Sequence, residues 1–109
     1  MIPDLINKFR SLNGVGNVQN WDHGLGLHCS MHCLAMTHRG NLYHADECYL
    51  DGCREAVAFI GYSDWWQDRI IFDVLGTSEP HRKILLECNT MGYGYQYDNW
   101  KIYLTIRGK

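Results

Sequence analysis

The C-terminal segment 100–107 constrains the fold most, because its apolar and polar side chains alternate strictly. Successive side chains of a β-strand point to opposite faces of a sheet, so this pattern predicts a strand with one buried face. Shorter alternations at 70–74 and 84–88 predict two more strands. Three strands joined by short connections indicate an antiparallel meander. The apolar positions of the last strand are Trp100, Ile102, Leu104 and Ile106.

The N-terminal segment 3–13 predicts an amphipathic helix. Pro3 suits the first helical turn, and Asn13-Gly14 supplies a stop signal. The glycine-rich stretch 14–26 that follows is typical of a loop. The apolar residues at helical spacing are Leu5, Ile6, Phe9 and Leu12.

The segment 27–37 fits both kinds of regular structure. As a strand, it alternates its apolar residues onto one face; as a helix, it places His28 four residues from His32. We favour the strand, which would form a hairpin with 41–49 through a tight turn at 38–41.

Two later segments complete the expected fold. Residues 51–61 predict a second helix capped by Asp51, with a strand over 56–62 as the alternative. Residues 91–97, which alternate tyrosine and glycine, predict a flexible loop. The fold class is therefore α+β, with an antiparallel sheet of about five strands, an N-terminal helix and a second helix near 51–61. A mostly-β barrel with one helix is the alternative.

Length, charge and hydropathy limit the kinds of function that the chain can have. At 109 residues the chain predicts one globular domain, 1–109. The net charge is −2, and the ten Lys and Arg residues are scattered, which argues against binding to nucleic acid or an anionic membrane. The N-terminal residues lack a signal-peptide pattern and no long apolar run occurs, so we expect a cytoplasmic protein. In an exported protein, Cys48 could instead pair with Cys53, or Cys29 with Cys33.

A dense set of histidines and cysteines lies between residues 28 and 53. It suggests zinc, but the spacing matches no standard site with two close ligand pairs. On a strand, His28 and His32 point away from Cys29 and Cys33, so the four cannot share one ion. We therefore assign no residue to a metal and expect no cofactor. The members of the set are His28, Cys29, His32, Cys33, His38, His44, Cys48 and Cys53.

The expected hairpin register places histidines opposite carboxylates. His32 would face Glu47, and His28 would lie near Asp51. A carboxylate orients and charges an imidazole, which is the basis of general acid–base catalysis, but such pairs also occur on ordinary solvated sheet faces. His28, His32 and Glu47 are thus candidates for a ligand-binding face, and enzyme activity is not favoured.

Aromatic residues concentrate in two expected connections, at 64–68 and 91–97. Rigid amphipathic rings separated by glycine are typical of recognition loops, although such a loop can also fold back over a sheet. We predict a non-catalytic binding protein that recognises a protein partner or a small molecule; a zinc-binding protein and a small enzyme are the alternatives. An exposed apolar strand face would favour a homodimer. The binding candidates here are Trp65, Trp66, Tyr93, Tyr95 and Tyr97.

Overall fold

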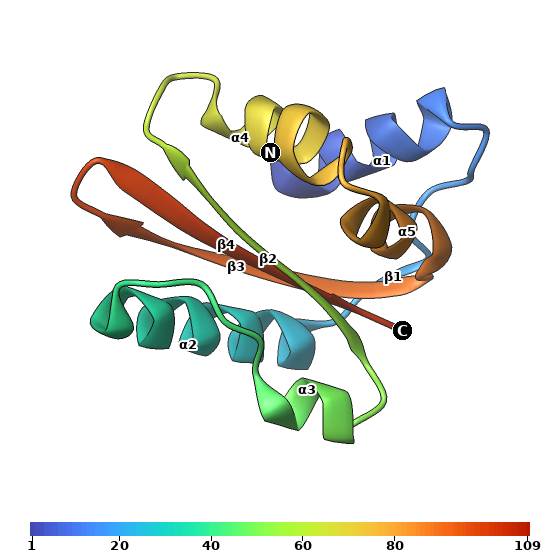
Figure 1. The fold of residues 1–109 in the computed structure, drawn as a ribbon. Helices are drawn as coiled ribbons and strands as arrows, with labels where there is room; N and C mark the ends of the chain where they lie inside the picture. The colour runs from blue at the N-terminus through green and yellow to red at the C-terminus, as the bar shows by residue number, and fades with distance from the viewer.

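A four-stranded mixed sheet forms the middle layer of the molecule (Figure 1). The structure is a computed structural model that describes residues 1–109, the side chain of Leu50 excepted. The strand order is β1-β3-β4-β2, with β1 parallel to β3 and the other pairs antiparallel. The strands are β1 (Asn20–Trp21), β2 (Arg54–Gly61), β3 (Thr90–Asp98) and β4 (Lys101–Gly108).

Helices cover both faces of this sheet, as Figure 1 shows. One layer contains α2 (His23–Arg39) and α3 (Asp46–Leu50). The other contains α1 (Ile2–Leu12), α4 (Trp66–Arg69), the π-helix η1 (Ile70–Leu75) and α5 (Glu79–Glu87). The α+β class and the N-terminal helix are confirmed. The sheet has four strands instead of about five, one pair is parallel, and no barrel forms because the sheet is open at β1 and β2.

The C-terminal strand is the best sequence prediction. β4 buries Ile102, Leu104 and Ile106 in the core beneath α1, η1 and α5. Its alternate side chains are also buried, because α2 covers the second face. Trp100 lies before the strand and is exposed. Alternation therefore located this strand correctly, but its polar positions point into protein and not into solvent.

The strand predicted at 27–37 is wrong, because this segment lies inside helix α2. The Asp22 carboxylate accepts a hydrogen bond from Leu25 N at 2.9 Å and caps the helix start. Gly40 ends the helix in the left-handed conformation, with φ of 74°. Residues 41–49 therefore form no hairpin with it, and α3 occupies 46–50 instead.

The loop predicted at 91–97 is also wrong, because these residues form β3. Gly92 and Gly94 face α2, and a Cβ at Gly94 would lie 2.7 Å from Ser30 Cα. Because neither glycine has a Cβ, the backbone of α2 packs directly against this part of β3. Tyr93, which lies between the two glycines, points to the opposite face of the sheet, and Tyr95 and Tyr97 share its strand parity.

Three further segments differ from the expected elements. Residues 54–61 form β2, so the alternative strand at 56–62 was the better prediction and the helix at 51–61 is wrong. The expected strands at 70–74 and 84–88 lie in η1 and α5. Short apolar runs do not separate strand from buried helix, and here they belong to helices packed against the sheet. No helix among the described residues has the length and apolar character needed to cross a membrane.

Candidate functional site

The predicted histidine face lies on the side of α2 that faces α3. His32 is buried, and its Nε2 lies 2.7 Å from the carbonyl oxygen of Tyr43. Its ring also packs edge-to-face on Tyr43, with centroids 4.8 Å apart. His28 lies one turn earlier on the exposed surface, where it lines a hollow of about 160 Å³ together with Met31 and Glu47. The structure thus brings His28 and Glu47 to one hollow, while His32 is held by the backbone.

Glu47 forms an ion pair with Arg107 that the expected hairpin did not include. Arg107 Nη2 donates to Glu47 Oε1 at 3.0 Å, although the Glu47 side chain is 57% exposed. This hydrogen bond lowers the pKa of the Glu47 carboxyl below its ordinary value. Glu47 is therefore an ionised partner of a buried arginine.

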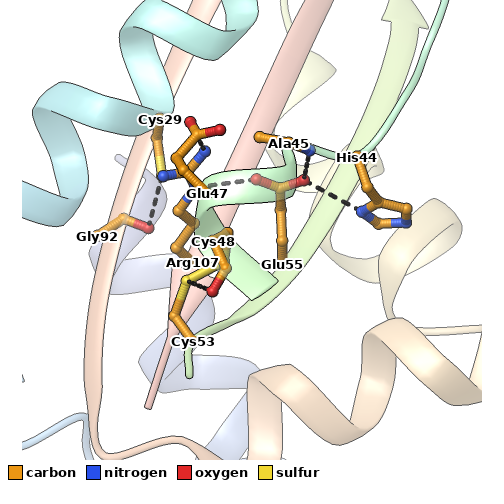
Figure 2. The surroundings of a disulfide bond; sticks show 9 residues. All are labelled: Cys29, His44, Ala45, Glu47, Cys48, Cys53, Glu55, Gly92 and Arg107. Atoms are coloured by element: carbon orange, nitrogen blue, oxygen red, sulfur yellow. Dashed lines mark hydrogen bonds and ion pairs between the residues drawn. A yellow bond between two sulfur atoms is a disulfide. The ribbon is translucent and has the colours of Figure 1, made fainter. Parts of the chain in front are cut away.

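A buried charge network joins β2, β4 and the segment before α3 (Figure 2). The Arg107 side chain is 1% exposed, and its Nε donates to Glu55 Oε2 at 2.9 Å. The other oxygen of Glu55 accepts from Ala45 N at 2.9 Å and lies 3.1 Å from His44 Nδ1. Burial opposes the charge of Arg107, but hydrogen bonds to Glu47 and Glu55 outweigh it and raise the Arg107 pKa.

The network leaves one histidine oriented by a carboxylate at the surface. Glu55 is 4% exposed, whereas His44 is 64% exposed. Two hollows, of about 610 and 350 Å³, share His44 and Ala45 in their walls. A buried carboxylate that fixes an exposed imidazole is chemically suited to accept or donate a proton. We did not predict the His44–Glu55 pair from the sequence, because Glu55 lay in an expected helix.

A second histidine lies within electrostatic reach of His44. His81 is half-buried on α5, and its Nδ1 has no hydrogen-bond partner in the described part of the chain. Burial lowers the His81 pKa below its ordinary value, and the charge of His44 lowers it further. The folded protein thus disfavours the protonated form of His81.

This shift predicts a loss of stability on acidification. Because the pKa is lower in the folded state, the unfolded chain takes up the proton first below about pH 6.5. The free energy of unfolding should therefore fall from about pH 7 towards pH 5. Urea denaturation across this range should show a smaller fall for His81→Asn. An unchanged pH dependence in that variant would contradict the assignment. The lowered pKa of Glu47 acts separately, at a more acidic pH than the His81 effect.

The cysteines divide into one disulfide and three buried thiols. Cys48 on α3 pairs with Cys53, which directly precedes β2 (Figure 2). Burial raises the pKa of Cys29 to about 12 and that of Cys33 to about 11, so neither is a reactive thiolate. Cys88 is also buried. Among the described residues, no group of three or more His, Cys, Asp or Glu side chains could hold a metal ion.

The predicted aromatic residues lie together only in part. Trp66 is 4% exposed and belongs to the core, where its ring contacts Tyr95 and Tyr97 with centroids 5.1 and 6.1 Å away. Tyr93 is half-buried and packs edge-to-face on Trp21. Tyr95, Tyr97 and Trp65 are exposed. The three tyrosines lie on one face of the sheet because they are two residues apart in strand β3. The expected loop did not include this alternation.

Exposed aromatic rings gather where the β3–β4 hairpin turns and β2 ends, which Figure 1 places on one side of the molecule. The Tyr62 and Tyr97 rings lie 6.2 Å apart, and Trp100 packs against Gly61. Lys101 Nζ lies 5.2 Å from the Phe59 ring centre and 5.6 Å from that of Trp100. We call these residues the aromatic end. Its members, each between 38% and 70% exposed, are Phe59, Tyr62, Trp65, Tyr95, Tyr97 and Trp100.

Comparison with known proteins identifies the fold. No family model matches the chain, and no curated protein matches it. Among solved structures, it is similar to an extracellular protein containing a SCP domain from Bacillus anthracis str. Ames (TM-score 0.71, 21% identity). It is also similar to a cysteine-rich secretory protein from Staphylococcus aureus subsp. aureus Mu50 (TM-score 0.66, 18% identity).

The extent of this similarity limits what it establishes. The matches cover 99% of this chain but only 39% and 37% of the other two. One fold hosts many functions, and function depends on the residues of the site. At these identities the chain shares the fold of two larger proteins.

Proposed function

We propose that this chain is a non-catalytic binding domain that recognises a protein partner or a small ligand through the aromatic end. The observation that carries the proposal is the set of six exposed aromatic side chains near the β3–β4 turn and the end of β2, with Phe59 on the face of the sheet towards α2 and Tyr95 and Tyr97 on the opposite face. Large exposed apolar surfaces on a domain often mark interaction sites. Tyrosine and tryptophan supply large contact areas at low conformational-entropy cost, which makes them frequent binding hot spots.

The core supports this interpretation in part: Tyr95 and Tyr97 cover the buried Trp66, whereas Trp65 and Trp100 remain largely exposed. Ile70, Ile71 and Leu75 fill the layer between the sheet and α1. Trp66 is buried among them, whereas its neighbour Trp65 is 70% exposed. Trp65 is therefore available for contact with a ligand, whereas Trp66 is not.

Matched substitutions separate the two roles. Trp65→Ser, Tyr97→Ser and Trp100→Ser should each change the free energy of unfolding by less than about 1 kcal/mol. Trp66→Ala should lower it by about 3–5 kcal/mol, because it creates a cavity. Urea denaturation measures both. The three serine variants should also weaken any ligand selected on the wild-type chain by at least tenfold, since hot-spot truncations cost about 2 kcal/mol. Unchanged affinity in all three would contradict the proposal.

We further propose that the protein works in an oxidising compartment, in place of the cytoplasm expected from the sequence. The Cys48–Cys53 disulfide supports this, because such bonds persist outside the reducing cytosol. The two similar solved proteins are described as extracellular and as secretory.

Counting thiols in denatured protein prepared without reductant tests the redox state. Three reactive thiols are expected, from Cys29, Cys33 and Cys88, rising to all five cysteines after reduction. Cys53→Ser should expose the thiol of Cys48 as well. Closure of so short a loop should stabilise the fold by about 2 kcal/mol in the chain-entropy picture. Five thiols before reduction would contradict the assignment.

A further inference from the structure

The edge strand β3 has an open backbone beyond its pairing with β1. β1 pairs only with Thr90 and Met91, after which Asp22 N donates to Met91 O at 2.8 Å and α2 begins. Thr90 and Lys109 exchange both backbone hydrogen bonds, at 2.9 and 3.3 Å. Antiparallel pairing alternates, so Gly92 and Gly94 bond to β4 while Tyr93 and Tyr95 direct N–H and C=O outward.

These outward groups have no backbone partner outside the β3–β4 ladder among the described residues. Edge strands are normally protected by charges, proline or a bulge. The sequence from Thr90 to Tyr97 contains no charged residue and no proline. An unprotected edge of this kind is a template for a further strand.

A hollow of about 560 Å³ lies beside the edge at the point where β1 stops. Trp21 and Tyr93 form part of its wall, and Leu27 and Ser30 contribute from α2. Leu27 is an exposed apolar side chain. The hollow therefore offers mainly apolar surface to a side chain placed next to the open edge.

We propose that an extended peptide segment of a partner protein binds here as a fifth strand, in line with β1. This rests on the proposed function and names the partner class, because Tyr95 and Tyr97 belong both to the edge strand and to the aromatic end. The added strand pairs with the N–H and C=O groups of Tyr93 and Tyr95, which only an extended backbone can match in spacing. A segment of about five residues, roughly 17 Å long, spans the open edge.

The position of α2 favours a peptide, and not a second copy of this chain, as the source of the added strand. Gly92 and Gly94 contact Gly26 and Ser30, so the first turns of α2 lie directly above β3. Pairing of two β3 edges about a two-fold axis would place a second α2 above a strand only about 4.8 Å away. Packed helices need about 8–10 Å between their axes. A slender peptide avoids this clash.

The test begins with selection of ligands from a random-sequence peptide library displayed on phage, using the full chain. Binding of the selected peptides is then compared between Tyr95→Ala and Tyr95→Pro. The alanine variant loses the ring but keeps the N–H, whereas the proline variant also loses the N–H. Proline is tolerated at an outward-facing edge position, so the fold should persist, which circular dichroism checks.

The expected result is that Tyr95→Pro weakens binding about tenfold more than Tyr95→Ala, because one or more backbone hydrogen bonds are lost. Hydrogen exchange at the Tyr93 and Tyr95 amides should slow when peptide is bound. N-methylation of the peptide should abolish binding at alternate positions only, and this test does not depend on the folding of the proline variant.

Three results would overturn strand addition. One is failure to select any peptide. Another is equal affinity for the alanine and proline variants together with unprotected Tyr93 and Tyr95 amides. The third is protection of those amides in a dimer of the free protein. Peptides that need the aromatic rings but tolerate every N-methylation would leave the proposed function standing and remove only the fifth strand.

Discussion

Glu55→Ala is expected to lower the free energy of unfolding by about 3–5 kcal/mol, the range seen when a buried ion pair loses one partner. Arg107 is 1% exposed and its Nε donates to Glu55 at 2.9 Å, so the variant leaves a buried guanidinium without its closest anion. Glu55 also accepts from Ala45 N, which holds the start of α3 against the sheet. Urea denaturation of the oxidised protein measures the loss.

Glu47→Ala is the matched control, because it removes a carboxylate from the same guanidinium. The Glu47 side chain is 57% exposed, so its loss removes a less desolvated charge and should destabilise the fold less than removal of the buried Glu55. If Glu55→Ala proved no more destabilising than Glu47→Ala, the buried network would not be the element that fixes α3.

Gly94→Ala is the second substitution with a large expected effect, about 3 kcal/mol, at the upper end of the range for overpacking. An added Cβ would lie 2.7 Å from Ser30 Cα and even closer to Ser30 N. The obstacle is helix backbone, which cannot move aside as a flexible side chain can. The variant must therefore lift α2 from β3, and near-UV circular dichroism should change along with stability.

Gly16→Ala serves as the control for this substitution. No atom lies within 4 Å of a Cβ built there, and its backbone is not in the left-handed region. Its stability should change by less than about 0.5 kcal/mol. Equal effects of the two alanines would show that close approach of α2 does not explain Gly94.

The error at 27–37 arose because helix and strand periods coincide at a spacing of four. Cys29 and Cys33 fall on one face under either period, so their burial favours neither. Met31 and Met36 separate the two cases. A strand would bury Met31, which is exposed, whereas the helix buries Met36, three residues beyond Cys33. The alternation over residues 27–35 therefore gave the wrong prediction, whereas the apolar Met36, three positions beyond Cys33, indicated the helix.

The alternating glycines of β3 were misleading in a different way. Gly92 and Gly94 suggested flexibility, but their two-residue spacing is also that of one strand face. What they provide is room for the backbone of α2, a tertiary contact that composition does not reveal. In contrast, the alternation of β4 predicted that strand correctly. Its signal is the burial of every second side chain within one segment, and no contact with another segment is needed to recognise it.

The charge network lay beyond prediction for a related reason. Glu55 and Arg107 are direct cross-strand partners in the β2–β4 register, although they are 52 residues apart in the sequence. Recognising the pair requires both segments to be strands and their register to be known. The aromatic end was partly predictable, since Trp65, Tyr95 and Tyr97 were identified from composition alone. Phe59, Tyr62 and Trp100 were not identified from the sequence, and only the folded structure shows them as exposed members of this group.

The most direct test of the central claim, recognition through the aromatic end, is a map of where ligands contact the full chain. Amide NMR signals are recorded while a library of small fragments and selected peptides is added. We expect shifts concentrated at residues 59–66 and 93–101, and their loss in the combined variant Trp65→Ser, Tyr97→Ser and Trp100→Ser. Ligands that instead shift the signals around His44 and Glu47, and that bind the combined variant as well as the wild type, would contradict that claim.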